Sequence, residues 1–222
     1  MEKIPNEPDL EKKLMSAVEA VYSPRLPYHN FEHAREIEKR VLEIADRCES
    51  EGVPINREVI RLAALFHDAG YHLDHVAKGC ESKEELSTFI AREELVKLNV
   101  KPEIIEEVLK TILATHRDAE FTTNEQKVLR AADLVSLAGE FETFLKNTVL
   151  LKREIEFLRG SAISWEEWKN STERLVKFYL SQDIRLTSFH DDENGRSVFH
   201  IATIQNLQRF LGMPESELKK LE

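Results

Sequence analysis

Histidine and aspartate side chains that could share one metal ion recur along the first 133 residues of this sequence. His29 and His33 are four residues apart, a spacing that puts two side chains one turn apart on the same face of a helix. His67 is followed directly by Asp68, and Asp133 lies in a segment that is otherwise apolar. Imidazole nitrogens and carboxylate oxygens together suit a divalent ion such as Mn, Fe, Co, Ni or Zn. These residue types therefore indicate a metal site.

Each of these residues also has a simpler structural explanation when it is considered singly. Asp133 could form a salt bridge with Arg130, because a buried carboxylate is costly unless a cation or strong donors face it. His67 could interact with the negative end of a helix dipole, and Asp68 could be a surface carboxylate. His33 could be a hydrogen-bonded histidine of the core. Only the combination of all four favours metal binding.

The elements that must position these side chains are predicted to be helices. Apolar residues repeat at intervals of three and four almost throughout, and the 222 residues include only 7 glycines and 7 prolines. Asn56 and Ser82 are expected N-caps, and Gly70 is expected to end the helix that carries His67. We therefore expect an all-α, multi-helix bundle. The expected helices are about residues 10–21, 34–48, 56–70, 82–95, 102–116, 125–138, 140–158, from 164 onward, and 198–211.

All of the chemistry-bearing residues fall within the stretch 25–138. The stretch 139–222 has the same helical periodicity, and no repeat, low-complexity segment or Ser/Gly linker separates the two. We therefore expect residues 1–222 to form a single domain, with 25–138 as its core and 139–222 as a C-terminal helical extension.

Composition narrows the expected partners and compartment. The net charge of −10, from 31 basic and 41 acidic residues, argues against a nucleic acid polymer as partner, because such binding needs clustered Lys and Arg. Met1–Leu10 is charged and holds two prolines, unlike a signal peptide, and no apolar run approaches the ~18 residues that cross a membrane. Cys48 and Cys80 suggest no disulfide framework. We therefore expect a cytoplasmic protein that does not bind membranes. The sequence leaves open whether the chain forms a homo-oligomer.

Three short segments resemble the HD-domain superfamily, whose ligand pattern is a His, a His-Asp pair and a later Asp. They are Tyr28–His33, Phe66–Tyr71 and Ala131–Leu134. The resemblance is closest to the small predicted metal-dependent phosphohydrolases of that superfamily. It implies an HD-type helical bundle in which ligands from different helices bind one divalent metal ion. This ion could be Mg as well as Mn, Fe, Co, Ni or Zn. The implied ligands are His33, His67, Asp68 and Asp133.

The resemblance also suggests catalytic roles. Cyclic-nucleotide phosphodiesterases have a similar Tyr-His-Asn-x-x-His segment in which the first His protonates the leaving oxygen, so His29 is the candidate general acid. Asp68 would hold the metal and help to orient the nucleophile, a water whose pKa the metal lowers toward ~7. Glu84 lies where many HD proteins have an acidic residue that could orient this water. As alternatives, His29 packs at a helix start, and Glu84 belongs to a capping box or a solvated face.

The chain departs from the phosphodiesterases and from the two-metal HD proteins at specific positions. Tyr71 stands where the phosphodiesterases have a His, which counts against a cyclic-nucleotide substrate. Two-metal members usually carry two further histidines between the His-Asp pair and the last Asp, but no His lies between Val76 and Thr115. We therefore favour one metal. His116 and His72 stay candidates for a second metal, a contact behind the ligands, or the substrate phosphate.

The function implied by the resemblance is hydrolysis of a phosphate ester of a nucleotide or a related small phosphorylated metabolite. Two alternatives stay open, a di-iron oxygenase of the HD type and a non-catalytic nucleotide-binding sensor. The sequence does not choose among the basic residues that could bind phosphate. They include Lys78, Arg92 and Arg117. The segment of Ser188, Phe189 and His190 could cover the pocket.

Overall fold

The structure, a computed structural model, describes residues 7–188 and 191–221. Phe189 and His190, which were expected to cover a pocket, lie outside the described residues. Residues 1–6, the first part of the N-terminal segment that does not resemble a signal peptide, also lie outside them. The described residues form helices and connecting loops and contain no β-strand. The predicted all-α fold is confirmed.

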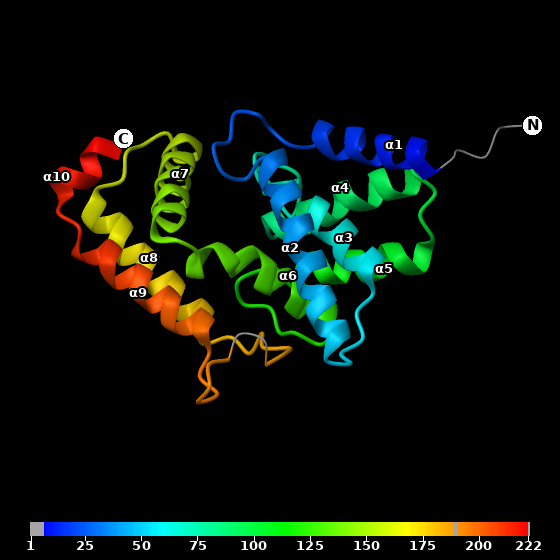
Figure 1. Cartoon of the computed structure of the whole chain (residues 1–222). Coiled ribbons are helices and arrows are strands. Elements are labelled where there is room, and N and C mark those ends of the chain that lie inside the picture. Colours follow the sequence, from blue (N-terminus) through cyan, green and yellow to red (C-terminus); the bar gives the residue numbers. More distant parts are fainter. Residues whose placement is uncertain (1–6, 189–190, 222) are drawn as a thin grey trace, which may run out of the picture. The chain divides into compact units, whose positions relative to one another are not determined.

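The chain forms two compact units, Met1–Ala132 and Asp133–Glu222 (Figure 1). The expected boundary, at residues 138 and 139, lies close to this division, and a single domain stays a prediction. The helices that lie in the first unit or begin there are α1 (Glu7–Ala20), α2 (Phe31–Ser50), α3 (Arg57–Phe66), α4 (Lys83–Lys97), α5 (Pro102–Leu113) and α6 (Asn124–Leu134). The second unit contains η1 (Val135–Ala138), α7 (Phe141–Arg159), α8 (Trp165–Leu180), α9 (Val198–Gly212), α10 (Glu215–Leu218) and η2 (Lys219–Leu221).

Helix α3 is the centre of the first unit. It packs against α2, α4 and α5, and every residue from Val59 to Phe66 except Arg61 is buried. The charged side chains of Arg57 and Arg61 lie on one side of α3 and form ion pairs, and the rest of the helix surface is apolar and suited to the interior of a bundle. The side chain of Asn56 caps α3 as predicted, by accepting a hydrogen bond from the backbone of Val59. The central position of α3 places the residues that follow its last turn inside the unit.

The second unit has its own core of aromatic and aliphatic side chains. They are Phe141, Phe144, Val149, Ile163, Trp165, Trp168, Phe210 and Leu218. Ser164, where a helix was expected to begin, is the N-cap of α8, and Gly160 ends α7 with a positive φ of 67°, a backbone conformation that glycine adopts without steric cost. Helix α9 packs against η1, α7 and α8 within this unit (Figure 1). The short helix α10 was not expected.

Two predicted helix ends in the first unit are wrong. Helix α3 ends at Phe66, ahead of Gly70, and the residues between them form turns. A Cβ at Gly70 would come within 3.0 Å of both the Leu86 side chain and the Ser87 backbone nitrogen. The glycine therefore allows α4 to approach closely instead of ending α3.

Helix α5 ends at Leu113, three residues before the expected end at His116. The buried guanidinium of Arg130 donates hydrogen bonds to the carbonyl oxygens of Ala114, Thr115 and His116, over 2.8 to 3.3 Å. These carbonyls bond a side chain from α6 instead of continuing a helical ladder, which is one way to satisfy the groups at a helix end.

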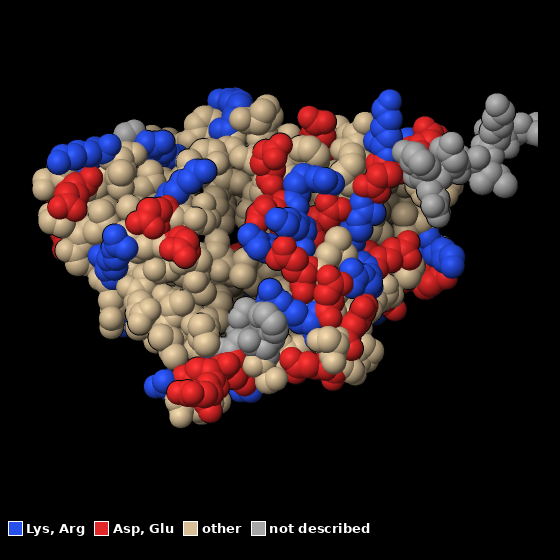
Figure 2. All heavy atoms as spheres, viewed as in Figure 1, with Lys and Arg blue, Asp and Glu red and all other residues tan. Residues whose placement is uncertain are grey.

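Charged side chains of both signs are mixed over the surface of α2. Arg40 forms ion pairs with Glu36 and Glu43, and Arg35 pairs with Glu38. Figure 2 shows basic and acidic side chains interspersed on the face that includes this helix. None of the described helices has the length and apolar character that a bilayer crossing requires.

Candidate metal centre

The first part of the site is the N-terminus of α2. The side-chain oxygen of Asn30 accepts a hydrogen bond from the backbone of His33 at 3.1 Å, and its amide donates to the Leu26 carbonyl at 3.1 Å. Asn30 is therefore the N-cap, and it fixes the first turn of α2. His33 lies in this turn with 9% of its side chain exposed. His29 precedes the cap, so only His33 of the predicted helical pair is in the helix.

The second part of the site follows the last turn of α3. His67 is the C-cap residue, and its Nδ1 lies 2.8 Å from the carbonyl oxygen of Ala64. Because a carbonyl only accepts, Nδ1 carries the proton, and Nε2 of the neutral ring carries the lone pair. This arrangement is typical of a metal-binding histidine, whose second nitrogen is held by a backbone carbonyl. His67 is 1% exposed, so its ring is held inside the unit.

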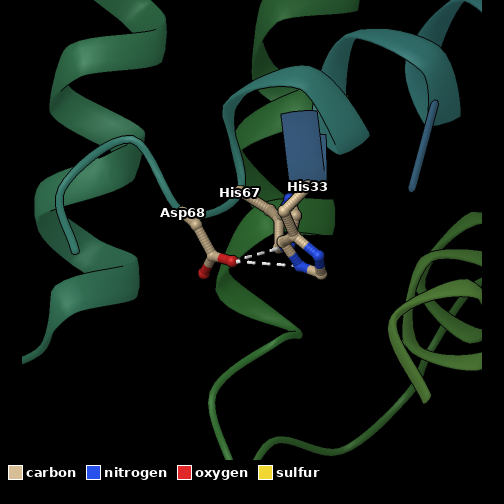
Figure 3. Close-up of side chains that lie close together, drawn as sticks. All are labelled: His33, His67 and Asp68. Atoms are coloured by element: carbon tan, nitrogen blue, oxygen red, sulfur yellow. Dashed lines mark ion pairs between the residues drawn. The ribbon is translucent and has the colours of Figure 1, made fainter. Parts of the chain in front are cut away.

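The imidazoles converge on one oxygen of Asp68. The Nε2 atoms of His67, His33 and His29 lie 2.9, 3.6 and 3.8 Å from Asp68 Oδ2. Figure 3 shows the His33 and His67 rings on one side of this carboxylate oxygen. One ligand atom from each of His33, His67 and Asp68 lies within 4.8 Å of the other two, the only such group among residues 7–188 and 191–221. The structure therefore brings three of the four predicted ligands together.

The electrostatics of Asp68 reflect this convergence. Burial by itself would raise the pKa of the Asp68 carboxyl, but positive charge on His67, His29 and His33 and a hydrogen bond from His67 hold that pKa below its ordinary value. When the His67 ring is neutral, its Nε2 lone pair faces the carboxylate, and a cation between the two would attract both. Two imidazole nitrogens and one carboxylate oxygen are a donor set that suits a divalent transition metal or zinc. The residues present fit such an ion.

His29 lies beside the group formed by His33, His67 and Asp68 but outside it. Its Nε2 faces Asp68, 12% of its side chain is exposed, and its ring stacks on Tyr71. A histidine next to the ligands and reachable from solvent has the location that a general acid requires. That role stays a prediction.

The fourth predicted ligand, Asp133, is half-buried in the last turn of α6. It is not in the group of ligand atoms that lie within 4.8 Å of one another. Its role as a ligand stays a prediction.

Glu84 and Glu85 differ in their contacts at the start of α4. The backbone N–H of Glu85 donates to the side chain of Ser82 at 3.1 Å, and its carboxylate accepts from the backbone of Glu81. Ser82 is therefore the N-cap of this helix, as predicted, and Glu85 is its partner in the first turn. Glu84 is half-buried in the same turn, and its expected role in orienting water stays a prediction.

The two further histidine candidates lie outside the three-ligand group. His116 is exposed, and its Nδ1 accepts a hydrogen bond from the backbone of Asp118 at 3.3 Å. His72 is half-buried in the loop after the His-Asp pair, where burial and then the charge of Lys83 lower its pKa. Their proposed contacts with a metal or a phosphate stay predictions.

The basic residues considered for phosphate binding lie at the surface. Arg92 pairs with Glu106 at 2.7 Å and Arg117 pairs with Asp118 at 3.0 Å, while Lys78 is exposed in the loop before α4. These surface contacts add no reason to choose among the three.

Sequence reasoning missed two residues next to the site, Tyr71 and Lys83. Tyr71 drew attention only because phosphodiesterases have a His there, yet its ring stacks on His29 at a centroid distance of 3.7 Å. No sequence pattern marks Lys83, yet its Nζ lies 3.7 Å from the centre of the Tyr71 ring. The one sequence feature that could have indicated a role for Tyr71 is its position three residues after Asp68, where the phosphodiesterases have a histidine.

Comparison with known proteins gives one match. The sequence profile of the HD domain matches residues 28–138, which include every residue of the three-ligand group. No curated protein and no solved structure matches the chain significantly.

Proposed function

This chain belongs to the HD-domain family, and we propose that it is a metal-dependent phosphohydrolase that cleaves a phosphate ester of a nucleotide or a related small phosphorylated metabolite. HD domains are hydrolase-type domains that bind divalent metals. The observation that carries the proposal is the convergence of the His33 and His67 Nε2 atoms on Asp68 Oδ2, at 3.6 and 2.9 Å.

In this proposal His33, His67, Asp68 and Asp133 hold one divalent ion. A bound divalent metal supplies Lewis-acid activation of a water molecule and of a phosphoryl oxygen. The hydrogen bond from His67 Nδ1 to the Ala64 carbonyl keeps Nε2 directed at the ion, because it fixes both the tautomer and the ring direction. Asp68 contributes a negative charge to the ion and an oxygen that can orient the attacking water.

His29 is proposed to protonate the leaving oxygen. Its Nε2 lies 3.8 Å from Asp68 Oδ2, so a substrate phosphate at the ligands would place its leaving group near this ring. Glu84 is proposed to assist in orienting water from the first turn of α4. Because an acidic chain repels polyanions, a small phosphorylated molecule is a better candidate substrate than a nucleic acid polymer. We propose a cytoplasmic location for this activity.

The test combines elemental analysis with a screen of phosphorylated metabolites in the presence of Mn, Co or Ni. The unchanged protein should contain a divalent metal and release phosphate from at least one nucleotide or sugar phosphate. His67→Ala should lower both the metal content and the phosphate release, because it removes the most buried ligand. His200→Gln is the matched control, since this histidine contacts Ser197 and the Leu180 carbonyl in the second unit and should leave both unchanged.

Each rival predicts a different result from the same experiment. Two irons per chain together with oxygen uptake would overturn the proposal in favour of a di-iron oxygenase. Nucleotide binding with bound metal but no phosphate release from any substrate would overturn it in favour of a non-catalytic sensor.

A further inference from the structure

The ring of Tyr71 stacks on the imidazole of His29 next to the metal ligands. The ring centroids are 3.7 Å apart and the planes are inclined by only 22°. The backbone N–H of Tyr71 donates to the carbonyl of Asp68 at 2.9 Å, so the turn after the His-Asp pair fixes where this tyrosine stands. His29 has no such backbone constraint from a helix, because it precedes the N-cap of α2. The stack therefore joins a loop histidine to a well-defined turn.

Lys83 holds Tyr71 in two ways. Its Nζ donates to the Tyr71 carbonyl oxygen at 2.8 Å and lies 3.7 Å from the centre of the Tyr71 ring, a cation–π distance. The His29 ring centroid also lies 3.7 Å from this centre. The Tyr71 ring is therefore in contact with both a cation and an imidazole.

The close approach of α4 puts Lys83 in this position. Lys83 is the first residue of α4, and Ser87 of the same helix accepts a hydrogen bond from the backbone of Gly70 at 3.0 Å. A Cβ at Gly70 would meet that helix at 3.0 Å, so only glycine leaves the present spacing unchanged. The docking of α4 against the turn after His67 is thus the origin of the contact between Lys83 and Tyr71.

We propose that Tyr71 is a positioning residue that fixes the plane and direction of the His29 imidazole, and that Lys83 acts through Tyr71. The χ2 torsion of a histidine is broad, so a ring without packing on its face samples many directions. Stacking restricts the ring to directions that keep Nε2 toward Asp68, where it is observed at 3.8 Å. The proposal has a geometric part, the fixed direction of the His29 ring, and a catalytic part, the effect of that direction on hydrolysis. The catalytic part rests on the proposed function, and the geometric part does not.

The geometric part is tested by NMR of the histidine ring protons, which needs no substrate. The ring current of Tyr71 should move the His29 signals upfield, and their loss in His29→Gln identifies them. Tyr71→Leu should shift them downfield, whereas Tyr71→Phe, which keeps a stacking ring, should not. Lys83→Met should also shift the His29 signals downfield, but by less than Tyr71→Leu does. Lys83→Arg, which keeps a cation beside Tyr71, should leave the His29 signals where they are in the unchanged protein. Unchanged His29 signals in Tyr71→Leu would overturn the proposal.

The catalytic part is tested by comparing esters with good and poor leaving groups. An acid that protonates the leaving oxygen matters most when that group is a poor one, so Tyr71→Leu should lower kcat for an alkyl phosphate by roughly tenfold or more and for a nitrophenyl phosphate by much less. Tyr71→Phe should restore kcat, and metal content should stay constant. Equal losses for both esters would show a merely structural role. Absence of phosphatase activity in the unchanged protein would refute the proposed function, while the NMR result would still decide the positioning of His29.

Discussion

Asp68 is the residue on which three imidazoles converge, and it faces them from the turn that follows a buried helix. Its side chain is 15% exposed, whereas that of His67 is 1% exposed. The His67 ring is therefore enclosed inside the unit, while the Asp68 carboxylate stays reachable from solvent. This combination suits a site in which the ion is held from within and the substrate arrives from solvent.

The low pKa of the Asp68 carboxyl gives a pH dependence in the metal-free protein. Because the folded pKa lies below the unfolded value of about 3.9, this carboxylate stabilises the fold above that value and the contribution is lost as the pH falls through the folded pKa. We expect the free energy of unfolding of the unchanged protein to fall more steeply than that of Asp68→Asn below about pH 5. Urea unfolding in the presence of a chelator measures both. Parallel pH profiles would contradict the assigned charge interaction.

How far the sequence predicts the site depends on what places each residue. The meeting of His33, His67 and Asp68 was implied by the resemblance to the HD-domain superfamily, because caps and apolar repeats mark helices without showing which helix ends lie together. The contact of Tyr71 with Lys83 could not be predicted, because the intervening loop has no periodic pattern that would show how α4 docks. His29 was expected at the start of a helix, and the cap at Asn30 excludes it from α2.

At the scale of secondary-structure elements, α3 positions His67 and Asp68 because a side chain from another segment forms a hydrogen bond to its last turn. The hydroxyl of Tyr22 donates to the Leu65 carbonyl at 3.0 Å, and this carbonyl is among the last of α3, which lack partners within the helix. The contact connects the segment after α1 to the turn that carries His67. The position of the ligands therefore depends on side chains from neighbouring segments as well as on the helix itself.

Removing that hydroxyl should cost stability without removing a ligand. Tyr22→Phe should lower the free energy of unfolding by about 1–2 kcal/mol, because it leaves the buried Leu65 carbonyl without this donor. Denaturant unfolding followed by circular dichroism measures the change, and elemental analysis of the folded variant should show an unchanged metal content. An unfolding midpoint equal to that of the unchanged protein would show that the hydrogen bond contributes nothing.

A methyl group at Gly70 should disturb the docking of α4. Gly70→Ala places a carbon 3.0 Å from the Leu86 side chain and the Ser87 backbone, so we expect a loss of about 1–3 kcal/mol in the free energy of unfolding. Gly212→Ala is the matched control, because a Cβ there meets nothing within 4 Å. Thermal unfolding of both variants gives the comparison. Equal stability of the two would mean that α4 moves without cost.

At the scale of the whole molecule, the ligand group and the second hydrophobic core belong to different compact units. His33, His67 and Asp68 lie in the first unit, and the aromatic core around Phe144 and Phe210 lies in the second. The sequence analysis placed a boundary near this division, but periodic apolar spacing could not predict a separate core in the second part, because helical periodicity shows which face is buried without showing against which partner.

The division predicts that core damage in the second unit leaves His33, His67 and Asp68 in place. Phe210→Ala removes a fully buried ring and should lower the free energy of unfolding of that unit by about 3–5 kcal/mol. Phe157→Ala is the control in the same unit, since 48% of that residue is exposed and its loss should cost much less. Below the unfolding temperature, both variants should retain the metal content of the unchanged protein in elemental analysis. Metal loss in Phe210→Ala alone would contradict the prediction.

The chain contains two tryptophans, Trp165 and Trp168, and both belong to the core of the second unit. Intrinsic indole emission therefore comes wholly from the second unit, which contains none of His33, His67 and Asp68. An optical assay that excites these indoles would follow the melting of the second unit and overlook events at these three residues. A fluorophore introduced into the first unit would let the two units be observed separately in one sample.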